Sequence, residues 1–439
     1  MSKSNYNLTR RRFVKETSLA TGGILLAPSI LSAQPMFKNE TTLKLAVVGC
    51  GGRGTGAASQ ALRSDDNVKL VALCDAFQDR LDQSHERLSK MFDTSKMDVP
   101  DTRKFVGFGS YQKAIDEADV VILATPPGFR PEHFEYAIAN GKHVFMEKPV
   151  ATDVAGIKKV LAAAKLAKEK KLNVVVGLQR RYQSSYREAY KRLTDIGKIV
   201  SGQVYWNSSG VWVRERQQEW TEMEYQMRNW YYFNWLCGDH ILEQHIHNID
   251  VANWFIGEYP VKAQGMGGRQ VRNGKDHGQI FDHHFVEFEY PSGAVISSQC
   301  RHQKGCMNRV SEMFQGTKGN LYTSGGHADL SDYEGTMKYK HNDDEDPNPY
   351  QIEHEELFAS IRKGGVISDG YNGAMSTMTA ILGRMATYTG KQVTMEEAMN
   401  ADHVLVPDET SLTWDSTPPA VMDANGNYPI PVPGKTKLW

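Results

Sequence analysis

Acidic and imidazole side chains gather in one stretch of the sequence, Gly238 to Asp250, which reads Gly-Asp-His-Ile-Leu-Glu-Gln-His-Ile-His-Asn-Ile-Asp. If this stretch is helical, residues four and seven positions apart share a face, so Glu243, His247 and Asp250 lie together and His240 joins them. An imidazole titrates near neutral pH and can exchange a proton with a substrate. An alternative is a polar helix whose histidines pair with buried groups.

A metal site is a second alternative for the same stretch, because His240, Glu243 and His247 are ligand types that could converge on one ion. Further ligands would then come from Asp282, His283, His284 or His302. No standard metal-ligand motif is present, so we predict that no metal is bound. His245 projects from a different side of the helix, and we expect it to be structural.

A glycine-rich loop, Gly49-Cys50-Gly51-Gly52-Arg53-Gly54, directly follows one predicted strand and opens a predicted helix. In this context Gly49 permits a tight turn, Gly51 lets the backbone approach a pyrophosphate, and Gly54 allows the helix to pack closely. The unpaired N–H groups at the helix start favour an anion. The loop, Gly52 and Arg53 included, therefore predicts a dinucleotide site.

Asp75 ends the second predicted strand, about 20 residues after the loop, where a carboxylate accepts hydrogen bonds from the adenosine ribose. It would repel a 2′-phosphate, and Ala76 and Phe77 offer no arginine to bind one. NAD is therefore favoured over NADP, with Arg80 as the one nearby cation that argues against it. Asp75 could instead cap the helix predicted from Gln78.

The elements that position these residues alternate between short apolar runs and stretches of helical length, the pattern of a doubly wound parallel sheet. We predict a Rossmann domain over residues 40–170. Its predicted strands are Leu43–Val48, Lys69–Cys74, Asp119–Ala124 and His143–Met146, with Asn173–Gly177 after them. Its predicted helices are Arg53–Arg63, Gln78–Phe92, Pro131–Asn140 and Ala155–Lys168.

Residues 171–405 change character, with longer, alternating strands at Ile199–Ser208, Phe281–Tyr290 and Ala294–Arg301. The triplet Pro291–Gly293 between two of them predicts a hairpin. The fold class is therefore an α/β Rossmann domain plus an α+β domain with a large, mainly antiparallel sheet, expected to serve substrate binding and oligomerisation. A helix is expected from Gly373 to Tyr388, and a C-terminal tail rich in proline and glycine, residues 406–439, is expected to wrap the surface.

Two further segments resemble the glucose-fructose oxidoreductase and inositol dehydrogenase (Gfo/Idh/MocA) family. They are Ala124–Pro127, followed by His133, and Gly141–Pro149 with its Glu-Lys-Pro signature. The resemblance continues through Gly316–Gly319 to the helix around Gly383 and covers most of the chain after residue 33.

The resemblance implies that Thr125 and Pro126 contact the cofactor and that Glu147 and Lys148 lie beside its nicotinamide. Lys148 can hydrogen-bond a substrate hydroxyl and hold the negative charge that develops as hydride leaves. Gly238–Asp250 is similar to the family's catalytic helix, usually Asp-x-x-x-His-x-x-Asp. Anchoring on Asp250 makes His247 the general base.

Glu243 takes the position of the family's aspartate, which is a departure from the pattern. We expect it to orient the substrate or the imidazole. By the same resemblance, Arg181 and Tyr182 match the family's position for substrate and cofactor contacts, with His240 and Asp250 as further substrate contacts. Arg180 is equally consistent with a contact of this kind and with an exposed charge at the domain boundary. Most of the tryptophans that crowd the stretch before Gly238 are expected in the core or at a subunit interface.

Residues 1–33 have the three parts of a twin-arginine export signal: the motif Thr9–Lys15, the mildly apolar stretch Leu19–Ala33, and a cleavage site after Ala33. The apolar stretch is too short to span a bilayer. A basic disordered tail is the alternative. We therefore expect a periplasmic or otherwise exported protein, transported already folded.

Composition points to a small-molecule partner. The chain has 439 residues, a formal net charge of -1 and no long basic run, so neither nucleic-acid binding nor a membrane span is expected. Five irregularly spaced cysteines indicate apolar packing rather than a disulfide framework. The family resemblance suggests a homo-oligomer, either a dimer or a tetramer.

Export limits the chemistry, because soluble NAD is expected to be scarce outside the cytoplasm. We expect a tightly bound cofactor that is recycled in place. The reaction expected is the abstraction of hydride from a secondary hydroxyl of a sugar or glycoside, with C3 of a glycoside as the expected carbon. One alternative is an NAD-dependent glycosidase that works by transient oxidation and elimination. Another is a non-catalytic carbohydrate sensor. Fold alone does not choose among them.

Overall fold

Strand β1 (Leu43–Val48) opens the first of two sheets in the computed structural model, which describes residues 41–437. The predicted export signal, residues 1–33, lies outside the described residues. Six parallel strands form this sheet in the order β3-β2-β1-β4-β5-β6. The remaining strands are β2 (Val68–Asp75), β3 (Lys104–Val106), β4 (Val120–Leu123), β5 (His143–Met146) and β6 (Val174–Val176).

This strand order is that of a Rossmann fold, and the predicted α/β domain is confirmed. The order reverses between β1 and β4, so the loops after these strands diverge and leave a ligand-binding crevice at their carboxyl ends. Strand β3 was not predicted, because three half-exposed residues at a sheet edge carry too little pattern. The sheet also takes in β6, beyond the boundary predicted at residue 170.

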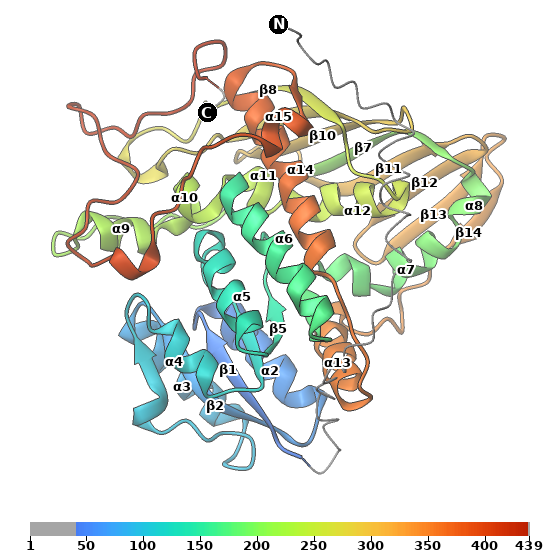
Figure 1. Cartoon of the computed structure of the whole chain (residues 1–439). Coiled ribbons are helices and arrows are strands. Elements are labelled where there is room, and N and C mark those ends of the chain that lie inside the picture. The colour runs from blue at the N-terminus through green and yellow to red at the C-terminus, as the bar shows by residue number, and fades with distance from the viewer. Residues whose placement is uncertain (1–40, 438–439) are drawn as a thin grey trace, which may run out of the picture. The chain divides into compact units, whose positions relative to one another are not determined.

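Alternate residues of β1 pack into two different cores. Leu45 and Val47 face one cluster, while Ala46 and Val48 face the other, as the two-residue period of a strand requires. Helices therefore cover both faces of the sheet (Figure 1). They are α2 (Gly52–Ser64), α3 (Gln78–Met91), α4 (Tyr111–Asp116), α5 (Arg130–Ala139), α6 (Val154–Glu169) and, from far along the chain, α13 (Pro349–Arg362), which packs on α2.

The second sheet has nine strands, in the order β14-β13-β12-β11-β7-β10-β9-β8-β15. Only β7 and β10 pair in parallel, so the prediction of a mainly antiparallel sheet is confirmed, as is the hairpin at Pro291–Gly293. The strands are β7 (Ile199–Ser208), β8 (Lys262–Gly268), β9 (His283–Glu289), β10 (Val295–His302), β11 (Arg309–Gly316), β12 (Gly319–Ser324), β13 (His327–Asp332), β14 (Met337–Lys340) and β15 (Val393–Thr394).

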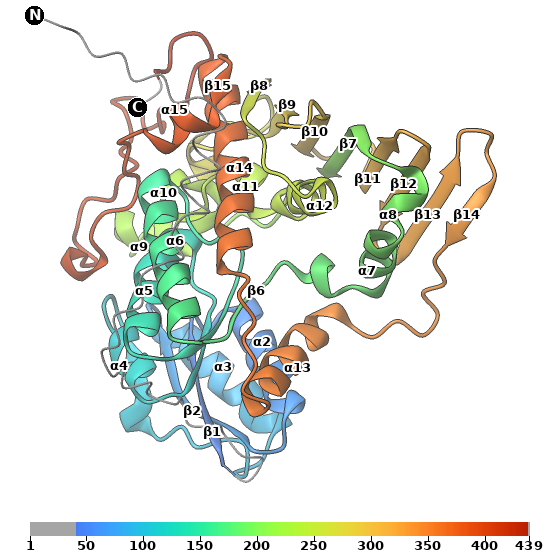
Figure 2. The same ribbon diagram turned by 45° about the vertical axis from the view of Figure 1, so that its right-hand side comes forward.

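Helix α14 (Gly370–Thr389) joins the two sheets, since it packs on β8 and β9 and also on α6 (Figures 1 and 2). It is buried along nearly its whole length, so almost every side is apolar or small. The other helices of this half are α7 (Ser184–Lys191), α8 (Leu193–Ile196), α9 (Glu222–Arg228), α10 (Asn234–Cys237), α11 (His240–Glu243), α12 (Ile246–Ile256) and α15 (Met395–Met399).

The prediction of one continuous helix through Gly238–Asp250 is wrong. The chain forms α11, turns at Gln244 and His245, and then begins α12. His245 is fully buried, and its Nε2 lies 2.7 Å from Ser298 Oγ on β10. This confirms its structural role. The contact between His245 and Ser298 joins two distant segments of the chain. The periodicity of the local sequence carries no information about such a contact, so it predicted one continuous helix.

The described part of the C-terminal tail, residues 406–437, is irregular apart from a 3₁₀ turn at Glu409–Ser411 and runs past α9 and α10 (Figure 1). Four of the five free cysteines are buried, which confirms the predicted apolar packing for them, but Cys306 is exposed and departs from that prediction. Among the described residues, no helix combines the length and the apolar character needed to cross a bilayer.

Candidate functional site

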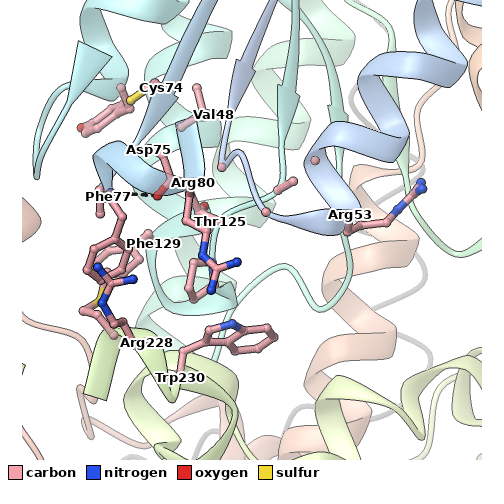
Figure 3. Close-up of a pocket in the computed structure, with 18 of the residues that line it drawn as sticks. Val48, Arg53, Cys74, Asp75, Phe77, Arg80, Thr125, Phe129, Arg228 and Trp230 are labelled. Atoms are coloured by element: carbon pink, nitrogen blue, oxygen red, sulfur yellow. Dashed lines mark hydrogen bonds between the residues drawn. The ribbon is translucent and has the colours of Figure 1, made fainter. Parts of the chain in front are cut away.

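A cavity of about 400 Å³ opens at the carboxyl ends of β1, β2 and β4 (Figure 3). Its lining includes every residue predicted to bind the cofactor except Glu147 and Lys148. These lining residues are Gly49, Gly51, Gly52, Arg53, Gly54, Asp75, Thr125 and Pro126. The cavity is therefore where the strand order places a dinucleotide site.

The three fingerprint glycines have the geometry that their predicted roles require. Gly49 has a φ of +100°, and a Cβ there would lie 2.5 Å from the carbonyl carbon of Ala124. A Cβ on Gly54 would lie 1.8 Å from the Gly49 carbonyl oxygen, so only glycine lets α2 approach the loop this closely. Gly51 faces open space, which leaves room for a pyrophosphate at the start of α2.

Asp75 joins the glycine loop to the strand end that it terminates. Its carboxylate accepts hydrogen bonds from the backbone N–H of Cys50 (2.7 Å) and of Phe77 (2.9 Å). Burial raises its pKa, and the two backbone donors oppose that shift. Asp75 is not the N-cap of α3, since Phe77 takes that position and donates its backbone N–H to Asp75. It therefore lines the cavity where a ribose is expected.

Arg53 and Glu147 form an ion pair with each other. The Arg53 Nε donates to Glu147 Oε1, and the guanidinium lies 4.9 Å from the ring centre of Tyr350 on α13. Figure 3 shows the Arg53 side chain extending away from Arg80 and Trp230. The pair ties the glycine loop to the strand end that carries Lys148. Arg53 therefore borders the cavity, and the carboxylate of Glu147 neutralises its charge.

Lys148 follows β5 and the pair of Glu147 with the cavity residue Arg53, and it contacts Glu243 of α11. Lys148 Nζ donates to the Glu243 carbonyl oxygen (2.7 Å) and lies 3.5 Å from Glu243 Oε1. His247 stacks on Trp206, with ring centres 5.9 Å apart, and its Nδ1 is buried without a partner among the described residues. Lys148 and Glu243 are therefore in direct contact, and the charge of Lys148 also acts on the imidazole of His247.

Burial sets the charges of this cluster. Burial raises the pKa of Glu243 to about 6, although Lys148 and Arg130 oppose the shift. Burial lowers the pKa of His247 well below its ordinary value, and the charges of Lys148 and Arg180 lower it further. At neutral pH the imidazole is therefore neutral and able to accept a proton, while the carboxylate is ionised beside Lys148.

The raised pKa of Glu243 makes the fold less stable as pH increases. The folded chain holds this proton more tightly than the unfolded chain, so the free energy of unfolding falls as pH rises from 4.5 to about 6. Glu243→Gln mimics the protonated group. We expect it to raise the free energy of unfolding by about 2 kcal/mol near neutral pH and to change it little at about pH 4, measured by urea denaturation.

The exposed Glu345 supplies the control, since Glu345→Gln should leave the urea midpoint unchanged at both pH values. Equal destabilisation of Glu243→Gln at both pH values would contradict the burial argument.

The residues predicted at the domain junction have partners inside the protein. Arg181 forms a two-bond ion pair with Asp250 (2.8 Å for each bond), and Tyr182 donates to Asp369 (2.6 Å). These bonds hold the junction together, and they occupy the groups that were expected to contact substrate. His240 is fully buried, and its Nδ1 lies 2.9 Å from Asp239 Oδ1.

Asp239, His240 and His284 form the metal-capable group of the described residues, with ligand atoms all within 4.8 Å of one another. The metal alternative based on the sequence shares His240 and His284 with it, but not Asp239. The Asp239 carboxylate already accepts bonds from the His240 backbone and ring, from Phe281 N–H and from Tyr388 O–H. With its lone pairs in use, this group fits a structural network better than a metal site.

Asp239 also occupies a backbone conformation that is nearly exclusive to glycine, with φ +81° and ψ 161°. Its four hydrogen-bond donors hold it there. The sequence analysis did not identify Asp239. For Arg180 it left an exposed charge as an equal alternative to a contact residue. Arg180 is buried and paired with Glu312 of β11. A buried charge can be recognised only once the strand that carries its partner is located.

Two parts of the chain match known protein families. Residues 43–178 match the model described as "Oxidoreductase family, NAD-binding Rossmann fold", and residues 194–322 match the model of the GFO/IDH/MocA C-terminal domain. Together they span more than half of the chain. The chain belongs to the Gfo/Idh/MocA oxidoreductase family. Its cofactor is NAD, and the open face of Gly51, the cavity and the ribose-facing Asp75 fit that molecule.

Relatives of known name cover part of the chain. Inositol 2-dehydrogenase from Burkholderia multivorans is 31% identical over 58% of this chain and 66% of its own length, just under two thirds. The 2,7-anhydro-N-acetylneuraminate hydratase of Escherichia coli is 28% identical over 41% of this chain and 44% of its own length.

Solved structures share the fold. Aldose-aldose oxidoreductase from Caulobacter crescentus has a TM-score of 0.64 at 21% identity and covers 80% of this chain and 99% of its own. Levoglucosan dehydrogenase, in a complex with NADH and levoglucosan, has a TM-score of 0.63 at 17% identity and covers 81% of this chain and 100% of its own.

Proposed function

We propose that this protein oxidises a secondary hydroxyl of a sugar, polyol or glycoside. The observation that carries this proposal is the contact between Lys148 and Glu243, together with the effect of the Lys148 charge on the buried imidazole of His247. Lys148 directly follows Glu147, which is paired with Arg53 of the NAD cavity. The names of the relatives, an inositol dehydrogenase and a levoglucosan dehydrogenase among them, support this substrate class.

Each residue of the cluster has a separate task in the oxidation. The Lys148 ammonium hydrogen-bonds the reacting oxygen and stabilises its developing negative charge. The neutral His247 takes the hydroxyl proton on a ring nitrogen. Glu243 holds Lys148 in place through its carbonyl and carboxylate oxygens. Bound NAD supplies the hydride acceptor.

The acid limb of activity should follow Glu243 rather than His247. The pKa of Glu243 is about 6, whereas burial lowers that of His247 well below its ordinary value. We therefore expect kcat/KM to fall as pH drops through about 6, and we expect this limb to disappear in Glu243→Gln even where its absolute rate is lower. Rate profiles of both proteins test this. An unchanged limb in the variant would assign the titration to another group.

The cofactor is proposed to stay bound and to be recycled by a second substrate. This follows from the proposed export of the folded protein through the twin-arginine pattern of residues 1–33. Fractionation of cells that produce the full chain tests the export, with a variant carrying lysines at Arg10, Arg11 and Arg12 as its control.

Transient oxidation followed by elimination is the second candidate, which would make the protein a glycosidase. The hydratase among the relatives favours it, since addition of water is not a net redox reaction. Mixing the purified protein with glycosides and following absorbance of the reduced cofactor discriminates between the outcomes. Reduced cofactor alone supports the oxidoreductase. Free sugar released without added NAD supports the glycosidase. If neither reduced cofactor nor free sugar forms, the result supports a carbohydrate sensor.

A homo-oligomer is proposed to form through the second sheet. The face of this sheet opposite α12 and α14 carries Met266, Val295 and Tyr322, which are 71%, 38% and 36% exposed. Exposed apolar side chains on one sheet face favour association. Light scattering on the eluting protein would show a dimer or tetramer, and Met266→Lys should weaken it.

A further inference from the structure

The NAD cavity has walls from three separate parts of the chain. The Rossmann loops supply one wall. A second wall comes from residues 209–233, here called the cap segment, and a third from the tail, residues 406–437. The cap segment contributes Trp212, Arg214, Met227, Arg228 and Trp230, and the tail contributes Glu409. Figure 3 shows Trp230 and Arg228 on the opposite side of the cavity from the strands.

The cap segment is fastened to the Rossmann domain by Arg228. Its guanidinium lies 3.2 Å from Asp79 on α3 and 4.1 Å from the ring centre of Phe77, and its Nε bonds Glu224 (2.8 Å). Phe77 follows Asp75 by two residues, so this contact closes over the adenosine end of the cavity. The bond from α9 to α3 therefore spans the cavity rim.

The tail is fastened to both sides. Glu409 Oε2 lies 2.7 Å from His133 Nε2 on α5. The ring of Trp414 lies 4.9 Å from that of Phe77 and 4.7 Å from that of Phe108, and its carbonyl accepts a bond from Thr221 of the cap segment (2.7 Å). The tail therefore braces the cap segment against the Rossmann loops.

The charges inside this cover suit the cofactor. Arg80 and Arg214 both border the cavity. Among the described residues, Arg214 has no carboxylate partner and lies 5.1 Å from the ring centre of Trp212, while the Arg80 Nε is 3.9 Å from Asp79. Two weakly paired guanidinium groups in a half-enclosed cavity favour an anionic ligand, as a dinucleotide is.

We propose that the cap segment and the tail form a cover that retains NAD through many turnovers, with Arg228 and Trp414 as its fasteners. This rests on the proposed function in one respect, since it explains how a recycled cofactor stays bound. Release requires the cover to open, and opening breaks the Arg228–Asp79 ion pair and the packing of Trp414 on Phe77 and Phe108. Slow release follows from the number of contacts that must break together.

The rate of NAD release tests the cover without any substrate. The purified protein is loaded with NADH, chased with excess NAD and followed by fluorescence. We expect Arg228→Met, which keeps the side-chain stem, and Trp414→Ala each to release NADH at least tenfold faster than wild type at matched melting temperature. Val421→Ala, an exposed residue of the same tail, is the control and should release at the wild-type rate.

Wild-type release rates in both Arg228→Met and Trp414→Ala would overturn the cover, as would rapid exchange in the wild-type protein itself. The outcome is separate from that of the proposed function. A protein that retains NADH slowly yet never reduces bound NAD with any sugar would refute the oxidation and leave the cover standing. Sugar oxidation with freely exchanging NAD would support the oxidation and refute the cover.

Discussion

Lys148→Met should lower kcat about 1,000-fold while NAD binding stays at the wild-type level. Methionine keeps the length of the side chain but removes the charge that stabilises the developing alkoxide. It also removes the bond to the Glu243 carbonyl, and this carbonyl then faces the methionine stem. Reduction of bound cofactor by a sugar, followed in a single turnover, measures the loss directly.

Lys158→Met is the matched control, because Lys158 is an exposed lysine of the same domain, on α6. It should turn over at the wild-type rate. A Lys148→Met protein that keeps both its melting temperature and more than a tenth of wild-type activity would remove Lys148 from the mechanism.

Gly54→Ala should abolish NAD binding, with less than a tenth of the wild-type cofactor content in the purified protein. The added Cβ would lie 1.8 Å from the Gly49 carbonyl oxygen and 3.3 Å from the Ala124 side chain. A backbone carbonyl cannot rotate away as a side chain can, so the whole loop must shift. That shift displaces the N–H groups that bind pyrophosphate. Cofactor released by denaturation and quantified by mass spectrometry gives the content.

Gly56→Ala, two residues along the same helix, isolates the steric effect. A Cβ there meets only Arg53 Nη1, at 3.7 Å, which is an ordinary contact. Alanine is also the better helix former, so this variant should bind NAD fully and unfold at a slightly higher temperature. Equal NAD content in Gly54→Ala and Gly56→Ala would show that the loop tolerates displacement.

Local pattern was enough for the parallel sheet. Strands β1 and β5 have the predicted bounds, Leu43–Val48 and His143–Met146, because each is a mainly apolar run that is followed directly by a glycine or a charged residue. The glycine loop could be assigned for the same reason, since a strand, a tight turn and a helix start all lie within about a dozen residues.

Contacts between distant segments were not predictable in this way. The break between α11 and α12 depends on Ser298, more than 50 residues from His245. Arg181 bonds Asp250, 69 residues away, and Tyr182 bonds Asp369. These pairs likewise form only when the domain junction is assembled. Spacing alone treats such groups as available for substrate.

The sequence by itself determined the Rossmann order of elements, the NAD fingerprint and the types of side chain near the reaction, because these depend on neighbours within one strand–helix unit. Only the tertiary structure decided which charges face the cavity and which are neutralised, and that the tail closes the cofactor site. The reason is physical: burial and ion pairing depend on distance in space, and residues 53 and 147, or 133 and 409, meet only after the chain folds.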